Sequence, residues 1–333
     1  MEQRTDKAYA DGVWMESEGF GGQARSDGRA HFDDRVRIAV AVERAYQENG
    51  ETVQGSPKHS FSQMSDNKPI KEIIWSYGGG TQTAAIAVLV AQSRLPRPPQ
   101  IIMADTGRET DTTMRYLDQH IAPLLASVGL TVTILPHSYA HYDLYYPYTD
   151  GREATLPSMP MWTTKNGTTS LMPGHCSGVW KRDAVRKYLR ELGYGRTRPI
   201  TQWLGFSRDE LSRCKPSGRK WIDHQYPLID GYGISIKRSE CVQIVIDAGL
   251  PSPPKSRCWM CPYQNQAEWR DIKSRSTEWE SAVALDRELR DKDTDNAIYL
   301  HRSGVPLELA DLSDKPLPLF DYTSMECQDG CWV

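Results

Sequence analysis

Residues 73–90 read IIWSYGGGTQTAAIAVLV and carry the main clue to the fold of this chain. An apolar run ends at Ser76, three glycines and three polar residues follow, and an apolar pattern typical of a helix completes the segment. Glycines between a strand and a helix let backbone N–H groups approach an anion, and the helix N-terminus adds partial positive charge. The segment therefore predicts a strand, an anion-binding turn and a helix, with phosphate as the expected ligand.

From Lys71 onward, apolar runs typical of strands alternate with periodic segments typical of helices. We expect strands at 71–76, 100–105, 131–136, 199–206 and 225–229, and helices at 83–94, 109–129, 177–193 and 235–249. This order predicts an α/β fold in which a parallel, Rossmann-like sheet has helices on both faces. Ligands bind such sheets at the carboxyl ends of the strands, where the glycine turn would lie.

Three parts are expected along the chain. Residues 1–68 are polar, with one plausible helix at 33–47, and predict a flexible extension. Residues 69–232 would form a nucleotide-binding domain. Residues 233–333 would form a helical, cysteine-rich region that ends in a mobile tail.

Composition narrows the class of protein. A net charge of −3 excludes a histone-like cationic protein, so any contact with nucleic acid must come from a local patch. No apolar run reaches the ~20 residues of a transmembrane helix, and the N-terminus carries no apolar leader. We therefore expect a cytoplasmic protein without membrane contact, whose seven cysteines are thiols or metal ligands.

Three kinds of phosphate loop compete for the glycine turn. A Walker loop needs a lysine that is absent here. The dinucleotide fingerprint is half met, because Gly78 and Gly80 fit while Thr83 replaces its third glycine, and Asp105 could bind the ribose. The third kind, the PP-loop of the ATP pyrophosphatases, has the form S-x-G-G-x-D/Q-S/T, and SYGGGTQT resembles it. Its hydroxyl groups and amide would grip a pyrophosphate without a lysine.

A second segment, MADTGRETDTT at 103–113, resembles the ADTG-x-E segment of phosphoadenosine phosphosulfate (PAPS) reductase-like proteins. Asp105 and Thr106 would lie near the adenosine, although they could also cap the next helix. The expected nucleotide-binding residues are Ser76, Tyr77, Gly78, Gly79, Gly80, Thr81, Gln82, Thr83, Asp105, Thr106 and Gly107.

The cysteines suggest a metal centre. SRCWMCPY at 256–263 places Cys258 and Cys261 at a spacing that lets two thiolates bind one centre, and Cys241 and Cys176 could complete a set of four. Four thiolates suit either a structural Zn²⁺ or a 4Fe–4S cluster, and the spacing does not choose between them.

Further segments extend the resemblance to the PAPS reductase-like family over residues 70–270, in order. They are GHCSGVWKRDAVRKYLRE at 174–191, LGFSRDELSR at 204–213 and PPKSRCWMCPY at 253–263. The chain resembles the phage and plasmid members of this family and the DNA-phosphorothioation PP-loop enzyme. The resemblance implies ATP with Mg²⁺ and a 4Fe–4S cluster beside it.

The chain departs from the family at two places. Reductases that hold a cluster carry two adjacent cysteines where this chain has His175 and Cys176. Either Cys241, which we favour, or His175 would be the fourth ligand; otherwise one iron is open and could bind sulfide. In the tail, Glu326 and Cys327 only partly match a Glu-Cys-Gly motif. Cys327 and Cys331 could carry a persulfide, or they could be plain thiols.

Basic residues give the remaining candidates. Lys181 and Arg182 belong to a helix rich in cations that would bind phosphates or simply face solvent. Arg208 and Arg213 follow the WLGF strand, and an arginine there could neutralise the departing pyrophosphate. The aromatic tract at 141–148 could stack on bases or pack as a loop.

Three functions follow from these features. The first is an enzyme that adenylates an acceptor with ATP and then inserts sulfur. The acceptor would be DNA, tRNA or a small metabolite, and the sulfur source would be a donor protein such as a cysteine desulfurase. The second is a sulfonucleotide (PAPS) reductase. The third is a non-enzymatic nucleotide- or nucleic-acid-binding module with a zinc staple. An oligomer is compatible with each.

Overall fold

The computed structural model describes residues 8–10, 13–15, 71–137, 158–165, 167–229, 231–292 and 297–313. The chain forms two compact units, residues 1–70 and 71–333. In the first unit, β1 (Ala8–Ala10) pairs antiparallel with β2 (Val13–Met15). The helix expected at 33–47 lies outside the described residues.

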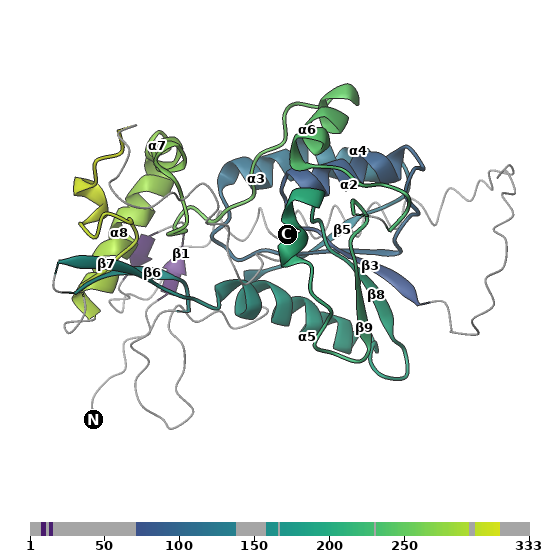
Figure 1. The fold of residues 1–333 in the computed structure, drawn as a ribbon, viewed down its shortest axis with the longest axis horizontal. Coiled ribbons are helices and arrows are strands. Elements are labelled where there is room, and N and C mark those ends of the chain that lie inside the picture. The colour runs from purple at the N-terminus through teal and green to yellow at the C-terminus, as the bar shows by residue number, and fades with distance from the viewer. Residues whose placement is uncertain are drawn as a thin grey trace, which may run out of the picture. The chain divides into compact units, whose positions relative to one another are not determined.

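The second unit is built on a five-stranded parallel sheet in the order β5-β4-β3-β8-β9, which confirms the expected α/β fold (Figure 1). The strands are β3 (Glu72–Ser76), β4 (Gln100–Ala104), β5 (Val132–Leu135), β8 (Ile200–Trp203) and β9 (Ile222–Gln225). Parallel strands need a crossover between them, and the helices supply it.

Helices cover both faces of this sheet (Figure 1). Successive side chains of a strand point to opposite faces, so Trp75 packs with one core and Ile74 with another. The first face is covered by α2 (Thr81–Ala91), by α6 (Arg238–Asp247), and by α3 (Asp111–Tyr116) with its continuations η1 (Leu117–Ile121) and α4 (Ala122–Ala126). The second face is covered by α5 (Asp183–Glu191), which continues a π-helical turn, η3 (Ser177–Arg182).

A third core lies beside the sheet. It joins α7 (Gln266–Lys273) and α8 (Ser276–Lys292) to a small antiparallel sheet of order β10-β6-β7. The strands are β6 (Met161–Lys165), β7 (Thr168–Met172) and β10 (Ala297–Tyr299), and a 3₁₀ turn, η5 (Leu307–Leu309), follows. The helical character expected for the cysteine-rich part is confirmed, whereas this sheet was not anticipated.

One expected strand is wrong. The edge strand is β9, and it ends at Gln225, where the strand expected at 225–229 would begin. Pro227 has no N–H to donate to a ladder, and the Ile229 N–H instead bonds the Tyr226 carbonyl in a turn. Within the described residues, no helix combines the length and apolar character needed to cross a membrane.

The carboxyl ends of β3, β4 and β8 meet at one edge of the sheet. The segments that leave these ends are the glycine turn, the ADTGRE segment and the stretch that enters η4 (Arg208–Arg213), a 3₁₀ helix. Three motifs that lie far apart in the sequence are therefore neighbours in space, because adjacent parallel strands end side by side.

Candidate active site

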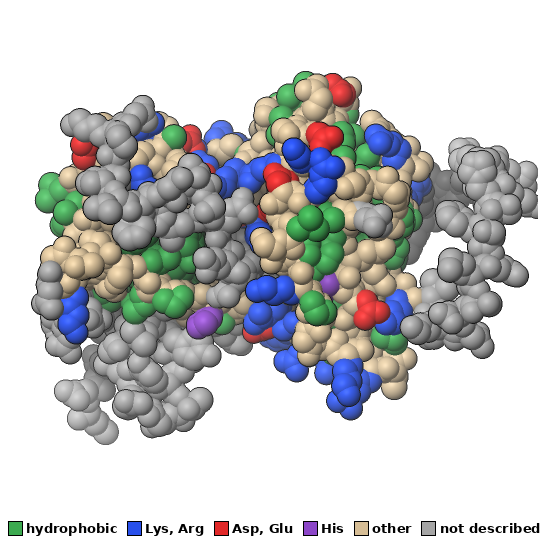
Figure 2. All heavy atoms as spheres, viewed as in Figure 1, with side chains coloured by type: hydrophobic (Ala, Val, Ile, Leu, Met, Phe, Trp, Pro, Cys, Tyr) green, Lys and Arg blue, Asp and Glu red, His purple; other side chains and the backbone are tan. Residues whose placement is uncertain are grey.

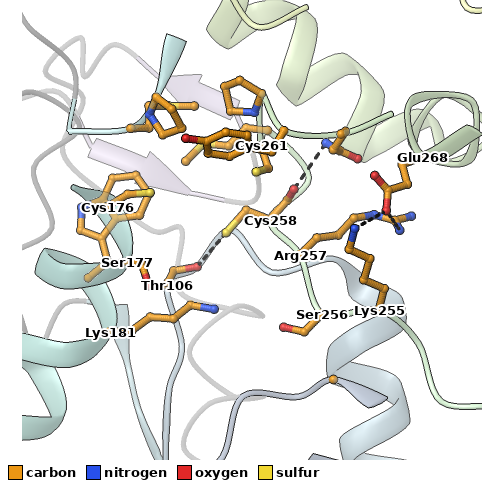
Figure 3. Close-up of a pocket in the computed structure, with 18 of the residues that line it drawn as sticks. Thr106, Cys176, Ser177, Lys181, Lys255, Ser256, Arg257, Cys258, Cys261 and Glu268 are labelled. Carbon is orange, nitrogen blue, oxygen red and sulfur yellow. Dashed lines mark hydrogen bonds and ion pairs between the residues drawn. The ribbon is translucent and has the colours of Figure 1, made fainter. Parts of the chain in front are cut away.

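A cavity of about 120 Å³ opens at this edge of the sheet (Figure 3). The start of α2 lines one side, η3 and the turn before it line another, and the segment 255–264 lines a third. Thr106 and the residues around η4 complete the wall. The cavity therefore joins the glycine turn to the cysteine motif.

The glycine turn is shaped to present backbone N–H groups. Gly79 has φ +77°, and a Cβ there would lie 2.6 Å from Thr113 Cγ2 and 3.8 Å from Ser256 Oγ. Within the described chain, the N–H groups of Gly78 to Thr83 have no hydrogen-bond acceptor. The first N–H groups of a helix with no cap are an anion site, and α2 has neither a capping side chain nor an acidic residue in its first turn.

The polar side chains of this turn are engaged within the protein. Ser76 Oγ accepts from Gln202 Nε2 at 2.7 Å, and Thr83 Oγ1 donates to the Gly80 carbonyl at 2.9 Å. Gln82 Nε2 donates to Glu210 Oε2 at 2.6 Å. These side chains therefore fix the shape of the turn. The expectation that its hydroxyl groups and amide grip a pyrophosphate stays a prediction.

The residues before the glycines and in the first helical turn are also buried. Tyr77 is 3% exposed and packs edge-on against Trp75, and burial raises the pKa of its phenol. Thr81 Oγ1 lies 3.4 Å from the Pro254 carbonyl, which ties α2 to the segment that precedes the cysteine motif.

The ADTG segment forms its own tight turn after β4. The Gly107 N–H donates to Asp105 Oδ1 at 2.7 Å, and Gly107 has φ +66°. Thr106 is fully buried and lines the cavity. Since α3 begins at Asp111 with Thr110 in the cap position, Asp105 and Thr106 do not cap that helix.

The cysteine motif is attached to this turn by backbone pairing. The Thr110 N–H bonds the Arg257 carbonyl and the Trp259 N–H bonds the Arg108 carbonyl, both at 3.0 Å. The resulting antiparallel bridge pairs Glu109 with Cys258. Cys258 Sγ consequently lies 3.8 Å from Thr106 Oγ1 and 4.0 Å from Glu109 Oε1.

A buried ion pair joins two of the motifs. Lys181 Nζ lies 2.8 Å from Glu109 Oε1, with side-chain exposures of 13% and 1%. Lys181 lines the large cavity and also a cavity of about 10 Å³ beside Ser76, Tyr77 and Gly78. Its ammonium group is therefore held between the glycine turn and the cysteines.

We expect Lys181→Met to destabilise the fold by about 3–5 kcal/mol, because it leaves the Glu109 carboxylate buried without its cation. Adding Glu109→Gln to the same chain should restore most of that stability, since the buried charge is then gone. Urea unfolding of the single and double variants measures this. If the double variant lost the sum of the stabilities lost by the two single variants, the ion pair between Lys181 and Glu109 would be contradicted.

Three of the four candidate ligand cysteines meet at the cavity. Cys176, Cys258 and Cys261 line it, and Figure 3 shows their sulfur atoms facing the same space. Burial and the Glu109 carboxylate raise the pKa of the Cys258 thiol. The fourth candidate, Cys241, lies elsewhere: it is fully buried where α6 packs against α2, and burial raises its pKa to about 12.

The donor set can be tested against the two expected metal groups. In the described part of the chain, no three His, Cys, Asp or Glu side chains stand close enough together to hold one metal ion. Cys176, Cys258 and Cys261 border one cavity, and their three sulfurs are donors of the kind that both Zn²⁺ and a 4Fe–4S cluster take. The choice between the two groups stays a prediction.

The other candidate residues are placed as follows. The side chain of His175 does not line the cavity, and its backbone N–H bonds the Ser158 carbonyl. Cys214 lies apart from the cavity, and burial raises its pKa to about 11. Cys327, Cys331 and the tract at 141–148 lie outside the described residues.

The basic candidates separate clearly. Arg213 lines the cavity and pairs with Glu210. Arg208 is exposed on the same 3₁₀ helix and is not among the residues that line the cavity, so its expected role stays a prediction. Arg182 also lies outside the lining and pairs with Asp183.

Sequence reasoning missed several groups that line the cavity, namely Arg238, Lys255, Ser256, Arg257, Gln264 and Glu268. The lining holds two acidic side chains, Glu210 and Glu268. It holds five basic ones, namely Lys181, Arg213, Arg238, Lys255 and Arg257. The signal was present in PPKSRC, where two cations and a hydroxyl precede the first cysteine of the motif. Four of the five basic side chains in the lining pair with carboxylates, and two of those carboxylates, Glu109 and Asp271, lie outside the lining. The lining itself is richer in cations than in anions, which favours an anionic ligand.

No protein-family model matches the sequence, and no curated protein matches it. One similar solved structure is a phosphoadenylyl-sulfate (PAPS) reductase from Candida auris in a phosphate complex, with 11% identity and a TM-score of 0.33, covering 69% of this chain and 92% of that chain. Another is the U34-tRNA thiolase NcsA from Methanococcus maripaludis with its 4Fe–4S cluster, with 13% identity and a TM-score of 0.35, covering 76% of this chain and 78% of that one.

At these identities and TM-scores, the similar structures do not assign a function, which has to come from the residues of the cavity. The sheet and its edge define an α/β protein with an uncapped glycine turn of the kind that binds anions. The same cavity holds three thiols and an excess of cations.

Proposed function

We propose that this chain is a PP-loop enzyme that uses ATP to adenylate an acceptor, as the first step of sulfur transfer to that acceptor. The observation that supports this most is the shared cavity: Gly80 and Gln82 of the glycine turn and the three cysteines Cys176, Cys258 and Cys261 border one space. A nucleotide bound at the glycine turn would place its phosphates within reach of a sulfur source.

Each half of the reaction has groups to serve it. In the first, the acceptor oxygen attacks the α-phosphorus of ATP, and pyrophosphate leaves with the electron pair. The N–H groups of Gly78 to Thr83 would hold the β- and γ-phosphates, with Mg²⁺, and Arg213 would neutralise the leaving group. Lys181, held between the two cavities by Glu109, would bind the α-phosphate.

In the second half, hydrosulfide displaces AMP from the adenylated acceptor, so that a carbon–sulfur or phosphorus–sulfur bond replaces the bond to oxygen. Cys176, Cys258 and Cys261 would hold a 4Fe–4S cluster, which supplies a binding site for a sulfur ligand or an electron. Trp180 and Met260, which are 2% and 1% exposed, also line the cavity. Both side chains would limit the access of water to the cysteines.

The main alternative is reduction of a sulfonucleotide such as PAPS, since the same cations would bind its phosphates. The two reactions differ in their products. Anaerobically purified protein is incubated with ATP, hydrosulfide and a pool of DNA or tRNA, and separately with PAPS and a thiol reductant. Pyrophosphate and AMP in equal amounts support the proposal. Sulfite from PAPS, with no pyrophosphate from ATP, overturns it in favour of the reductase.

The role given to Arg213 can be tested against a matched neighbour. We expect Arg213→Gln to lower kcat/KM for pyrophosphate release about 100-fold, as removal of one transition-state donor does. Arg208→Gln changes the same residue type on the same 3₁₀ helix but at an exposed position, and should leave kcat/KM unchanged. Equal losses in the two variants would contradict the assignment.

A further inference from the structure

A stripe of arginines leads away from the cavity along η3 and α5. Arg182, Arg186 and Arg190 follow each other at four-residue spacing, which puts them on one helical face. The residue before the stripe, Lys181, lines the cavity. At 1.5 Å per residue, the three arginines span about 12 Å, or some three to four nucleotides along one strand of a duplex.

A second basic segment lies next to this stripe. The Arg190 guanidinium lies 5.1 Å from the ring centre of Trp221, which places α5 beside residues 219–221. Burial and the nearby guanidiniums of Arg182 and Arg219 lower the pKa of Arg186. Arg219 therefore lies close to the stripe, and the exposed Lys220 follows it.

One carboxylate on this surface is shared by two of the arginines. Asp183 pairs with both Arg182, at 3.2 Å, and Arg186, at 3.4 Å, so one carboxylate serves two guanidiniums. Figure 2 shows Lys and Arg side chains gathered on this face over the region of α5. Like charges held this close repel each other unless a polyanion lies across them. This concentration stands out in a chain with a net charge of −3.

We propose that Arg182, Arg186, Arg190 and Arg219 form a track for the phosphodiester backbone of a nucleic acid whose reactive group enters the cavity past Lys181. The inference deepens the proposed function, on which it rests for the identity of the acceptor. Guanidinium groups suit phosphates because they offer paired donors in a fixed plane. Contacts to the backbone position a strand without reading its sequence.

The test uses the full chain without nucleotide, so it does not depend on adenylation. Fluorescence anisotropy measures binding of a labelled single-stranded DNA oligonucleotide and, in a second arm, of a labelled transfer RNA. The variant is Arg182→Gln with Arg219→Gln, which leaves unchanged Arg190, the arginine stacked on Trp221, and Arg186, whose side chain is largely buried. The control is Arg94→Gln with Arg97→Gln, two exposed arginines that follow α2, the helix that covers the other face of the sheet from α5.

We expect the stripe variant to lose about tenfold in affinity and to show a shallower dependence of affinity on salt, because two phosphate contacts are gone. The control should bind as the unchanged protein does. The arm that binds more tightly identifies the nucleic acid. A third arm measures binding to phosphatidylglycerol vesicles. Equal losses in variant and control, no binding to either nucleic acid, or equal binding to the vesicles would overturn the track. Binding without pyrophosphate release would leave the track standing and refute the adenylation.

Discussion

Replacing Gly79 with alanine is expected to lower ATP-dependent pyrophosphate release by at least about 100-fold. A Cβ at this residue would lie 2.6 Å from Thr113 Cγ2, and its φ of +77° strains any residue other than glycine. The turn would have to move, and the N–H groups that follow would no longer converge on one anion. The measurement is pyrophosphate release in the anaerobic assay described above.

Two further variants separate this effect from a loss of stability. Gly193→Ala places alanine at a comparable φ of +82°, at the end of α5, where a Cβ meets nothing within 4 Å. This variant should lose roughly 1–3 kcal/mol of stability, which is the backbone strain that alanine also causes at residue 79, and it should keep its activity. Adding Thr113→Ser to the Gly79 variant removes Cγ2, keeps the hydroxyl that bonds Thr110 at 3.0 Å, and should recover part of the rate. Equal rates in the Gly79 and Gly193 variants would refute the anion site.

Replacing Cys258 with alanine is expected to remove nearly all iron and the brown colour from anaerobically purified protein. Cys258 is fixed by backbone pairing with the ADTGRE segment, and its sulfur faces the cavity with those of Cys176 and Cys261. With one of three thiolates gone, too few ligands remain to hold a cluster. Iron and sulfide analysis, together with the absorption spectrum, measure the outcome.

The control for this prediction is the cysteine that sequence spacing favoured as fourth ligand. Cys241→Ala should keep the iron and lose about 1 kcal/mol of stability, because Cys241 is a buried apolar residue between α6 and α2. Cys214→Ala should also keep the iron. Loss of iron in the Cys241 variant, or bound zinc in place of iron in the unchanged protein, would contradict the assignment.

The fold was largely readable from local patterns. Buried parallel strands are apolar along their whole length, so short apolar runs predicted β3, β4, β5 and β8 close to their observed positions. The hairpin of β6 and β7 was missed, although Asn166 and Gly167 between two runs rich in threonine are a strong hairpin signal.

The site was readable in part. Spacing correctly brought Cys258 and Cys261 to one place, but it could not show which way α6 turns Cys241. The pattern did hold a hint, since Cys241 and Val245 are four residues apart and share the buried face of that helix. The pairing of Glu109 with Cys258 and with Lys181 depends on contacts between distant segments, which no local pattern encodes.

The central claim is that a nucleoside triphosphate binds at the glycine turn and is cleaved between its α- and β-phosphates. The most direct measurement is the product released from ATP by anaerobically purified protein supplied with hydrosulfide and nucleic acid. The account predicts pyrophosphate and AMP in equal amounts, both lost in Gly79→Ala and retained in Gly193→Ala. Orthophosphate and ADP as products, or no turnover and no binding of ATP, would contradict it.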